Sequence, residues 1–352
     1  MSISELLSST NETPLEASFF AQLQKRTEKE TKGGKPYLEW DIADATGAIT
    51  LKIWNNHPQF HSAADTAPDA LLQFSGQWTQ NQYGVDGKGW KFRLLTEDEK
   101  SEFLAGDPVT REKQNADWAD IVDFLSQLAD PRLKALCDVF VEQFEERFRR
   151  TAAARKNHHA RRGGLVEHVA QMMRSANAIC GVYPYLNRDL MIAGVLFHDC
   201  GKLWENTYPE AGFTQLHLMH GEMLGHIPLG LELVNKLWRD LPLENWREIE
   251  PASEDVRLHL LHLIASHHGQ YDFGSPTLPR TPEAHALHYV DNLDAKLEMV
   301  KDAYATANES APGIFERKFP LPAPLVTPLP PVADAQADEI EETPAPPSNE
   351  LF

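Results

Sequence analysis

The stretch LMIAGVLFHDCGK, residues 190–202, decides the fold of the larger part of this chain. Its apolar residues recur at three- and four-residue spacing, which predicts a helix that ends in the pair His198-Asp199. The residues that share this face are Leu190, Gly194, Phe197 and His198. A buried imidazole and carboxylate are costly unless a cation compensates the charge. The stretch therefore predicts a metal site inside a helical bundle.

Histidines and aspartates from other segments complete the candidate site. His168 shares the apolar face of a second predicted helix with Leu165, Val169 and Met172, and Asp291 lies on a third. The candidate metal ligands are His168, His198, Asp199, His226, His267 and Asp291. Mixed nitrogen and oxygen ligands suit Mn, Fe, Co or Zn better than Mg or Ca. This set favours metal-assisted hydrolysis of a phosphate ester.

Length and composition limit the classes of protein to which the chain can belong. The 352 residues suffice for two domains, each with its own core. A formal charge of −19 argues against a protein that simply coats nucleic acid. The three cysteines are widely spaced and form no CxxC motif, and neither a signal peptide nor a membrane-spanning run is recognisable. We expect a soluble protein of the reducing cytoplasm with no membrane association.

The N-terminal part has the pattern of short strands. Apolar and polar residues alternate over 37–42 and 49–53, on either side of the tight turn Asp44–Gly47. Further strands are expected at 71–78 and 90–95, so residues 15–97 predict a small all-β barrel of the OB type after an N-terminal segment, 1–14. Most aromatic residues should fill its core. The candidates for stacking on bases are Tyr37, Trp54 and Tyr83.

The remaining chain divides into three parts. Residues 98–116 are polar and predict a linker, and residues 117–312 predict an all-α domain. Residues 313–352 form an acidic, proline-rich tail that we expect to be disordered. That tail is either an inert end or a tether for a protein partner.

A basic run precedes His168. Between residues 147 and 162 there are seven arginines and lysines and no acidic residue. The run is either a solvated helix face or a patch that binds the phosphates of a substrate. The candidate nucleic-acid contacts in it are Arg155, Lys156, Arg161 and Arg162.

The ordered set of motifs resembles a known family. The motifs are Asn157-His158-His159, Glu167-His168, His198-Asp199-Cys200-Gly201-Lys202, Leu224-Gly225-His226, Ser266-His267-His268-Gly269 and the segment 288–296. From about Leu15 to Ser310 the chain resembles the HD phosphohydrolase superfamily and, within it, the YhaM-type 3′→5′ exoribonucleases. That family also carries an N-terminal OB domain, which the strand pattern predicts independently.

The resemblance implies a role for each matched residue. His168, His198, Asp199 and Asp291 would hold one divalent ion, and His226 and His267 a second ion that Asp199 bridges to the first. Lys202 would contact a phosphate oxygen, and His158 and His159 would donate protons or contact phosphate. His268 is either the ligand in place of His267 or orients it, and Glu222 is an outside candidate. The resemblance favours Mn²⁺, with Co²⁺ or Fe²⁺ left open.

The resulting hypothesis is a metal-dependent 3′→5′ exoribonuclease that degrades single-stranded RNA to nucleoside monophosphates. One alternative is a phosphohydrolase of a small nucleotide or cyclic dinucleotide. Another is a non-catalytic nucleic-acid-binding protein with a structural metal. The sequence leaves open whether single-stranded DNA is also bound and whether the chain forms a homo-oligomer, because no motif announces either property.

Overall fold

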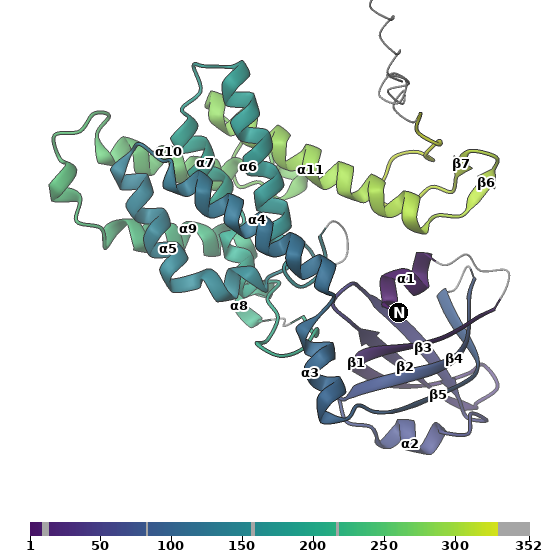
Figure 1. The fold of residues 1–352 in the computed structure, drawn as a ribbon. Coiled ribbons are helices and arrows are strands. Elements are labelled where there is room, and N and C mark those ends of the chain that lie inside the picture. Colours follow the sequence, from purple (N-terminus) through teal and green to yellow (C-terminus); the bar gives the residue numbers. More distant parts are fainter. Residues whose placement is uncertain (9–13, 82–83, 156–158, 216–217, 330–352) are drawn as a thin grey trace, which may run out of the picture. The chain divides into compact units, whose positions relative to one another are not determined.

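The computed structural model describes residues 1–8, 14–81, 84–155, 159–215 and 218–329 (Figure 1). The chain forms two compact units, Met1–Thr306 and Ala307–Phe352. In the second unit, β6 (Glu309–Ala311) and β7 (Ile314–Phe315) pair antiparallel, and Ile314 bridges Val326. The predicted disordered tail therefore starts with residues that pair as strands. Its remainder, residues 330–352, lies outside the described residues.

Five strands form one antiparallel sheet in the order β3-β2-β1-β4-β5 (Figure 1). They are β1 (Leu15–Glu30), β2 (Pro36–Ala43), β3 (Ala48–Trp54), β4 (Leu71–Asn81) and β5 (Gly84–Leu94). The helix α2 (Phe60–Asp65) connects β3 to β4. Five antiparallel strands with a helix between the third and the fourth are typical of the OB barrel. The predicted fold of this part is confirmed.

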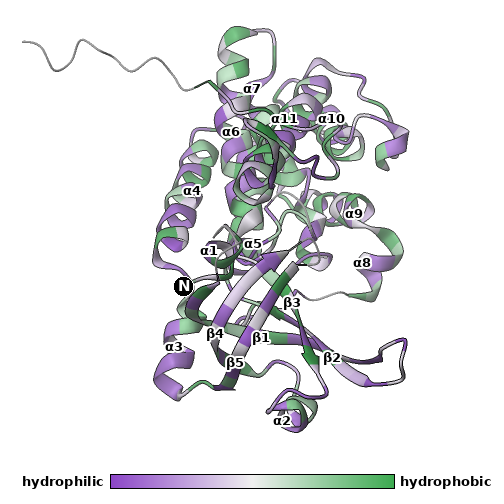
Figure 2. Cartoon of the chain, turned by 90° about the vertical axis from the view of Figure 1, so that its right-hand side faces the viewer, coloured by the Kyte–Doolittle hydropathy of each residue, from purple (hydrophilic) through white to green (hydrophobic). Residues whose placement is uncertain are grey.

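The barrel closes around an aromatic core. Burial alternates along β3, where Ile49, Leu51 and Ile53 point inward, and Figure 2 shows hydrophobic and hydrophilic residues following one another along the strands. Large side chains fill the interior: Phe19, Trp40, Phe74, Trp78 and Trp90. Burying a side chain of this size contributes roughly 1.5–3 kcal/mol. Most aromatics of the barrel therefore serve its core, as the alternation predicts.

The segments flanking the barrel are helical. The N-terminal segment forms α1 (Ile3–Ser8), and residues 98–116, predicted as a linker, lie in α3 (Glu97–Ala105) and α4 (Pro108–Ser126). Local sequence explains both of the latter helices. Thr96 and Glu99 form a capping box at the start of α3, and the Asp107 side chain caps α4, whose first residue is Pro108.

A helical bundle follows, with one continuous hydrophobic core. Its elements are α5 (Pro131–Arg149), α6 (Gly164–Val182), α7 (Arg188–Phe197), η1 (Cys200–Trp204), α8 (Met219–Leu224), α9 (His226–Arg239), η2 (Leu243–Trp246), α10 (Ser253–Ser266), η3 (Tyr271–Phe273) and α11 (Pro282–Thr306). Every residue of α7 from Leu190 to Phe197 is buried, as expected for a helix that is apolar on all sides. The pair His198-Asp199, which follows α7 directly, is thereby held inside the bundle. Among the described residues, no helix combines the length and the apolar character needed to span a membrane.

Candidate metal centre

The end of α7 places Asp199 against the start of α9. His198 continues the helix by one residue, and Asp199 begins the short helix η1. A Cβ atom at Gly201 would lie 1.9 Å from the carbonyl oxygen of His226, so only glycine permits this contact. The glycine of the HDCGK motif therefore lets η1 approach α9 closely enough for His226 to reach Asp199.

The two carboxylate oxygens of Asp199 face two different pairs of imidazoles. Oδ2 lies 3.3 Å from Nε2 of His198 and 3.8 Å from Nε2 of His168. Oδ1 lies 3.4 Å from Nε2 of His226 and 3.7 Å from Nε2 of His267. Four imidazoles from four segments of the chain therefore point their Nε2 atoms at one carboxylate.

The described residues form three groups of potential ligands, of which one consists of His159, His168 and Asp294. The other two lie around Asp199. His168, His198 and Asp291 form one, and His226, His267 and His268 form the other. Within each group, one ligand atom per residue lies within 4.8 Å of the others. Asp291 belongs to the first group because its Oδ1 lies 3.4 Å from Nε2 of His168. The six ligands named from the sequence are thus brought together, and His268 joins them.

In each of the four imidazoles that face Asp199, the outer nitrogen donates a hydrogen bond to an acceptor. Nδ1 of His198 donates to the carbonyl of Val195, and Nδ1 of His267 to that of Ile264, both at 2.8 Å. These carbonyls lie in the last turns of α7 and α10, where helix carbonyls lack intrahelical partners. A neutral imidazole that donates from Nδ1 carries its lone pair on Nε2. The helix ends thereby turn both Nε2 atoms into acceptors aimed at the centre.

Two carboxylates hold the other imidazoles in the same manner. Asp294 on α11 accepts from Nδ1 of His168 at 2.7 Å, and Glu205 accepts from Nδ1 of His226 at 2.9 Å. Such carboxylate–histidine pairs orient metal-binding imidazoles and raise their basicity. Neither carboxylate was among the candidate residues. Asp294 carries a readable signal, since it lies one helical turn after Asp291, whereas nothing near Glu205 in the sequence points to this role.

Four inner atoms of the site make no hydrogen bond to the part of the chain that the structure describes. Asp199 Oδ1, His226 Nε2, His267 Nε2 and His268 Nδ1 are buried and have no hydrogen-bond partner among the described residues. An unsatisfied buried polar atom costs roughly 1–3 kcal/mol, and four in one place require a compensating group. All four can donate a lone pair to a cation. The donor set therefore fits a divalent transition metal.

The electrostatics favour the metal-binding form of two ligands. Burial lowers the pKa of His267 well below its usual value, so the ring is neutral at physiological pH. Burial alone would raise the pKa of Asp199, but the nearby Lys202 and His198 hold it well below the usual range. Neutral imidazole and ionised carboxylate are the protonation states that bind metals.

Lys202 and His159 occupy different environments. Nζ of Lys202 lies 2.6 Å from Oδ2 of Asp199, at the edge of the centre. His159 is only 1 % exposed and contacts Asp294, with Nε2 3.2 Å from Oδ2. His159 therefore reaches the centre through Asp294 and His168. His158, Lys156 and Tyr83, which the sequence also proposed, lie outside the described residues.

The arginines proposed for nucleic-acid binding donate to protein acceptors. Arg155 forms ion pairs with Glu222 at 2.7 Å and Glu205 at 3.6 Å, which links Glu222 to the carboxylate that holds His226. Arg161 pairs with the buried Glu167 and with Glu298. Arg162 donates to the backbone carbonyls of Pro209, Glu210 and Gly212. The described part of the basic run thus serves internal contacts, because it packs against loops rich in carbonyl groups and carboxylates.

On the barrel, Tyr37 and Trp54 form an aromatic pair. They are directly opposed residues of β2 and β3, and their ring centroids lie 4.9 Å apart. Trp54 is 44 % exposed, in contrast to the buried Trp40, Trp78 and Trp90. The pair therefore lies on the outer face of the barrel, where an unstacked base can reach it.

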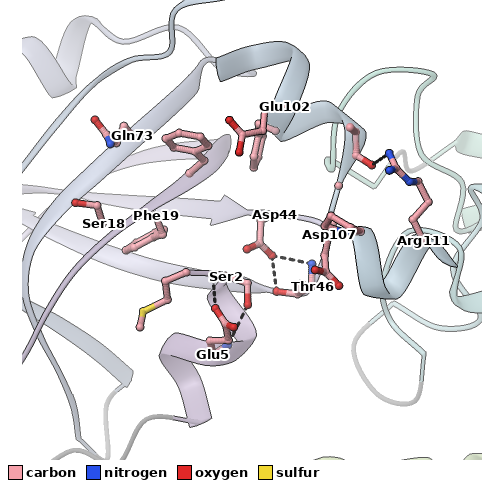
Figure 3. Close-up of a pocket in the computed structure, with 17 residues that line it drawn as sticks. Ser2, Glu5, Ser18, Phe19, Asp44, Thr46, Gln73, Glu102, Asp107 and Arg111 are labelled. Carbon is pink, nitrogen blue, oxygen red and sulfur yellow. Dashed lines mark hydrogen bonds between the residues drawn. The ribbon is translucent and has the colours of Figure 1, made fainter. Parts of the chain in front are cut away.

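Two pockets are candidates for the active site. A pocket of about 260 Å³ at the metal centre is lined by Asp199, Lys202, His268 and Asp291, among others. A larger pocket of about 550 Å³ lies beside the barrel, and its lining contains four acidic side chains and an arginine that donates to the carbonyl of Ala105 (Figure 3). These residues are Glu5, Asp44, Glu102, Asp107 and Arg111. An acidic lining repels phosphates, so the pocket at the metal centre is the candidate active site.

Comparisons with known proteins agree with this geometry. Residues 165–296 match the HD domain family, and this range contains all six proposed ligands. A "3'-5' exoribonuclease YhaM" from Geobacillus sp. (strain WCH70) is 33% identical over 297 residues, covering 82% of this chain and 85% of that protein. The protein of the same name from Bacillus subtilis (strain 168) is 33% identical over 299 residues, 83% of this chain and 89% of its own length.

Solved structures with similarity to this chain include OB-fold proteins. One is the second OB-fold domain of replication protein A from Methanococcus maripaludis, with 20% identity and a TM-score of 0.20, covering 28% of this chain and 95% of that one. Another is a chain of a replication protein A heterotrimer bound to ssDNA, with 14% identity and a TM-score of 0.23, covering 29% of this chain and 84% of that one.

Proposed function

Since the chain belongs to the YhaM family of 3′-5′ exoribonucleases, we propose that its metal centre removes nucleoside monophosphates from the 3′ end of single-stranded RNA. The enzyme is a metal-dependent hydrolase with an HD domain. The observation that carries the assignment of the site is the convergence of four Nε2 atoms on the two oxygens of Asp199. One carboxylate that serves two groups of ligands suits a pair of neighbouring cations.

Each group of ligands would hold one ion. His168, His198 and Asp291 would bind the first, and His226 with His267 or His268 the second, while Asp199, which lies between the two groups, would serve both. Support for His268 comes from its buried Nδ1, which lacks a partner among the described residues just as Nε2 of His267 does. The mixed nitrogen and oxygen donors suit Mn²⁺, the ion that we propose, and also Co²⁺ or Fe²⁺.

The residues around the proposed ions would have separate roles in hydrolysis. When bound, the ions supply an acidified water and neutralise charge that develops on the phosphate. Lys202 lies 2.6 Å from Asp199 and can turn its ammonium group toward a non-bridging phosphate oxygen. Asp294 and Glu205 keep His168 and His226 in one orientation throughout the reaction. His159 steadies Asp294 from its buried position.

The barrel would deliver the substrate. We assign single-strand binding to residues 15–97 and cleavage to residues 117–312. The exposed Tyr37–Trp54 pair offers a flat aromatic surface that any base can stack on. Sequence-tolerant stacking suits an enzyme that must follow RNA of any sequence, and it would also accept single-stranded DNA. The free, buried thiols of Cys137, Cys180 and Cys200 support a reducing cytoplasm as the place of action.

A labelled-RNA assay tests the proposal. Single-stranded RNA labelled at its 5′ end is incubated with Mn²⁺ and either the wild-type protein or Asp199→Asn. We expect a ladder that shortens from the 3′ end with the wild type and intact RNA with the variant. Elemental analysis of the wild type should find two ions per chain. Turnover of mononucleotides or cyclic dinucleotides with RNA left intact would contradict the assignment, as would undiminished cleavage by the variant.

A further inference from the structure

The pocket at the metal centre extends beyond the ligands. Besides Asp199, Lys202, His268 and Asp291, its lining includes Phe273, His288, Asn292, Ala295, Lys296 and Met299. Its volume of about 260 Å³ lies just below the ~300–1,000 Å³ range of small-molecule sites, so at most one nucleotide fits and a duplex does not. η3 contributes the aromatic ring of Phe273, and α11 contributes an amide, a thioether and a cation.

Phe273 is an exposed aromatic residue on an anchored loop. Its side chain is 55 % exposed although it lines the pocket, so packing does not require the ring. The loop packs against the end of α10, because Oγ of the buried Ser275 lies 3.2 Å from the carbonyl oxygen of Ala265 and 2.7 Å from that of Thr277. Ala265 lies two residues before His267. The ring is thereby tethered to the segment that supplies a metal ligand.

Lys296 provides an uncommitted positive charge. It is exposed, lies on α11 five residues after Asp291, and forms no ion pair with any residue that the structure describes. Lys202, in contrast, is already bound to Asp199. The pocket therefore contains one cation that serves the centre and a second cation whose charge is available to the substrate.

We infer that this pocket receives the 3′-terminal nucleotide, with Phe273 stacking on the base and Lys296 binding the phosphate backbone. The inference rests on the proposed exoribonuclease function and adds the residues that bind the 3′ end of the RNA. A terminal base has one face free of neighbours, which an exposed ring beside the scissile phosphate can cover. Because a ring stacks on every base, this grip holds the end of the RNA without selecting a sequence.

The test compares two substrates. One RNA ends in an ordinary nucleotide and the other in an abasic ribose, and kcat/KM is measured for removal of the terminal unit in Mn²⁺. We expect the wild type to prefer the ordinary end about 10-fold, equivalent to about 1.4 kcal/mol. Phe273→Ala should abolish this preference by slowing only the ordinary substrate. Tyr271→Ala is the matched control, because Tyr271 is an equally exposed aromatic of η3 that does not line the pocket.

A charge variant tests the second contact. Lys296→Met should raise KM for both substrates and reduce the dependence of log KM on log salt by about one ion. Lys236→Met is the control, since Lys236 is exposed, unpaired among the described residues and remote from the pocket lining. Equal rates on the two ends by the wild type would overturn the subsite and leave the exoribonuclease intact. Absence of cleavage on both substrates would overturn both proposals.

Discussion

Replacing Asp294 by asparagine tests whether the carboxylates behind the imidazoles govern the metal centre. Asp294 accepts from Nδ1 of His168 at 2.7 Å and from Nε2 of His159 at 3.2 Å. Asparagine retains the shape and one acceptor oxygen but removes the negative charge. The substitution therefore changes the electron-donating strength and the alignment of one metal-binding imidazole while leaving all six proposed ligands in the chain.

The expected loss follows from the type of contact. Loss of a partner that orients a metal-binding histidine typically costs 10–100-fold in metal affinity or activity, about 1.4–2.7 kcal/mol. Asparagine preserves a neutral hydrogen bond, so we expect a value near 10-fold for Asp294→Asn. Asp294→Ala removes the shared carboxylate from both imidazoles and should approach 100-fold. The alanine variant should also lose roughly 1–3 kcal/mol of unfolding free energy, the cost of unsatisfied buried donors.

The assay measures RNA cleavage as Mn²⁺ is titrated, which gives a half-saturating metal concentration for each variant. Asp138→Asn serves as the control, because Asp138 belongs to an exposed ion pair with Lys134, a type of contact worth about 0–1 kcal/mol. Urea unfolding of each protein separates loss of folding from loss of metal binding. A half-saturating concentration and a kcat for Asp294→Asn within twofold of wild type would refute the reasoning.

Four further substitutions have defined outcomes. Gly201→Ala should lower RNA cleavage more than 10-fold, because the added Cβ atom would lie 1.9 Å from a carbonyl oxygen of α9. Gly181→Ala is the control: its Cβ atom would meet nothing within 4 Å, and urea titration should show a gain of roughly 0.5–1 kcal/mol in the free energy of unfolding. Trp54→Ala should weaken binding of single-stranded RNA by about 1–3 kcal/mol in filter-binding assays. An unchanged affinity would contradict the proposal that bases stack on Tyr37 and Trp54. Arg132→Met should reduce the free energy of unfolding by about 3–5 kcal/mol, since it leaves Asp130 without the buried guanidinium 2.7 Å away, and a stable variant would contradict this.

The sequence predicted the elements that depend on local pattern. Alternation over β2 and β3 identifies the barrel, and the three- and four-residue spacing around His168 and His198 places both on inner helix faces. The helices over residues 98–116 were missed because their polar composition concealed two readable caps, Thr96 with Glu99 and Asp107 before Pro108.

Contacts that depend on tertiary packing could not be predicted from the sequence. The role of Glu205 requires that η1 lie against the start of α9. A spacing of 21 residues between Glu205 and His226 does not predict that their side chains are in contact. The basic run shows the same limit. Its charge is evident in the sequence, but the carbonyls of residues 209–212 that engage Arg162 become neighbours only in the fold.

The last long helix supplies Asp291 and Asp294, and the latter grips an imidazole 126 residues earlier in the chain. A ribosome-bound polypeptide that has not yet extruded α11 consequently lacks two of the carboxylates on which His168 depends. The first ligand group is therefore complete only when α11 has docked against the helix that carries His168.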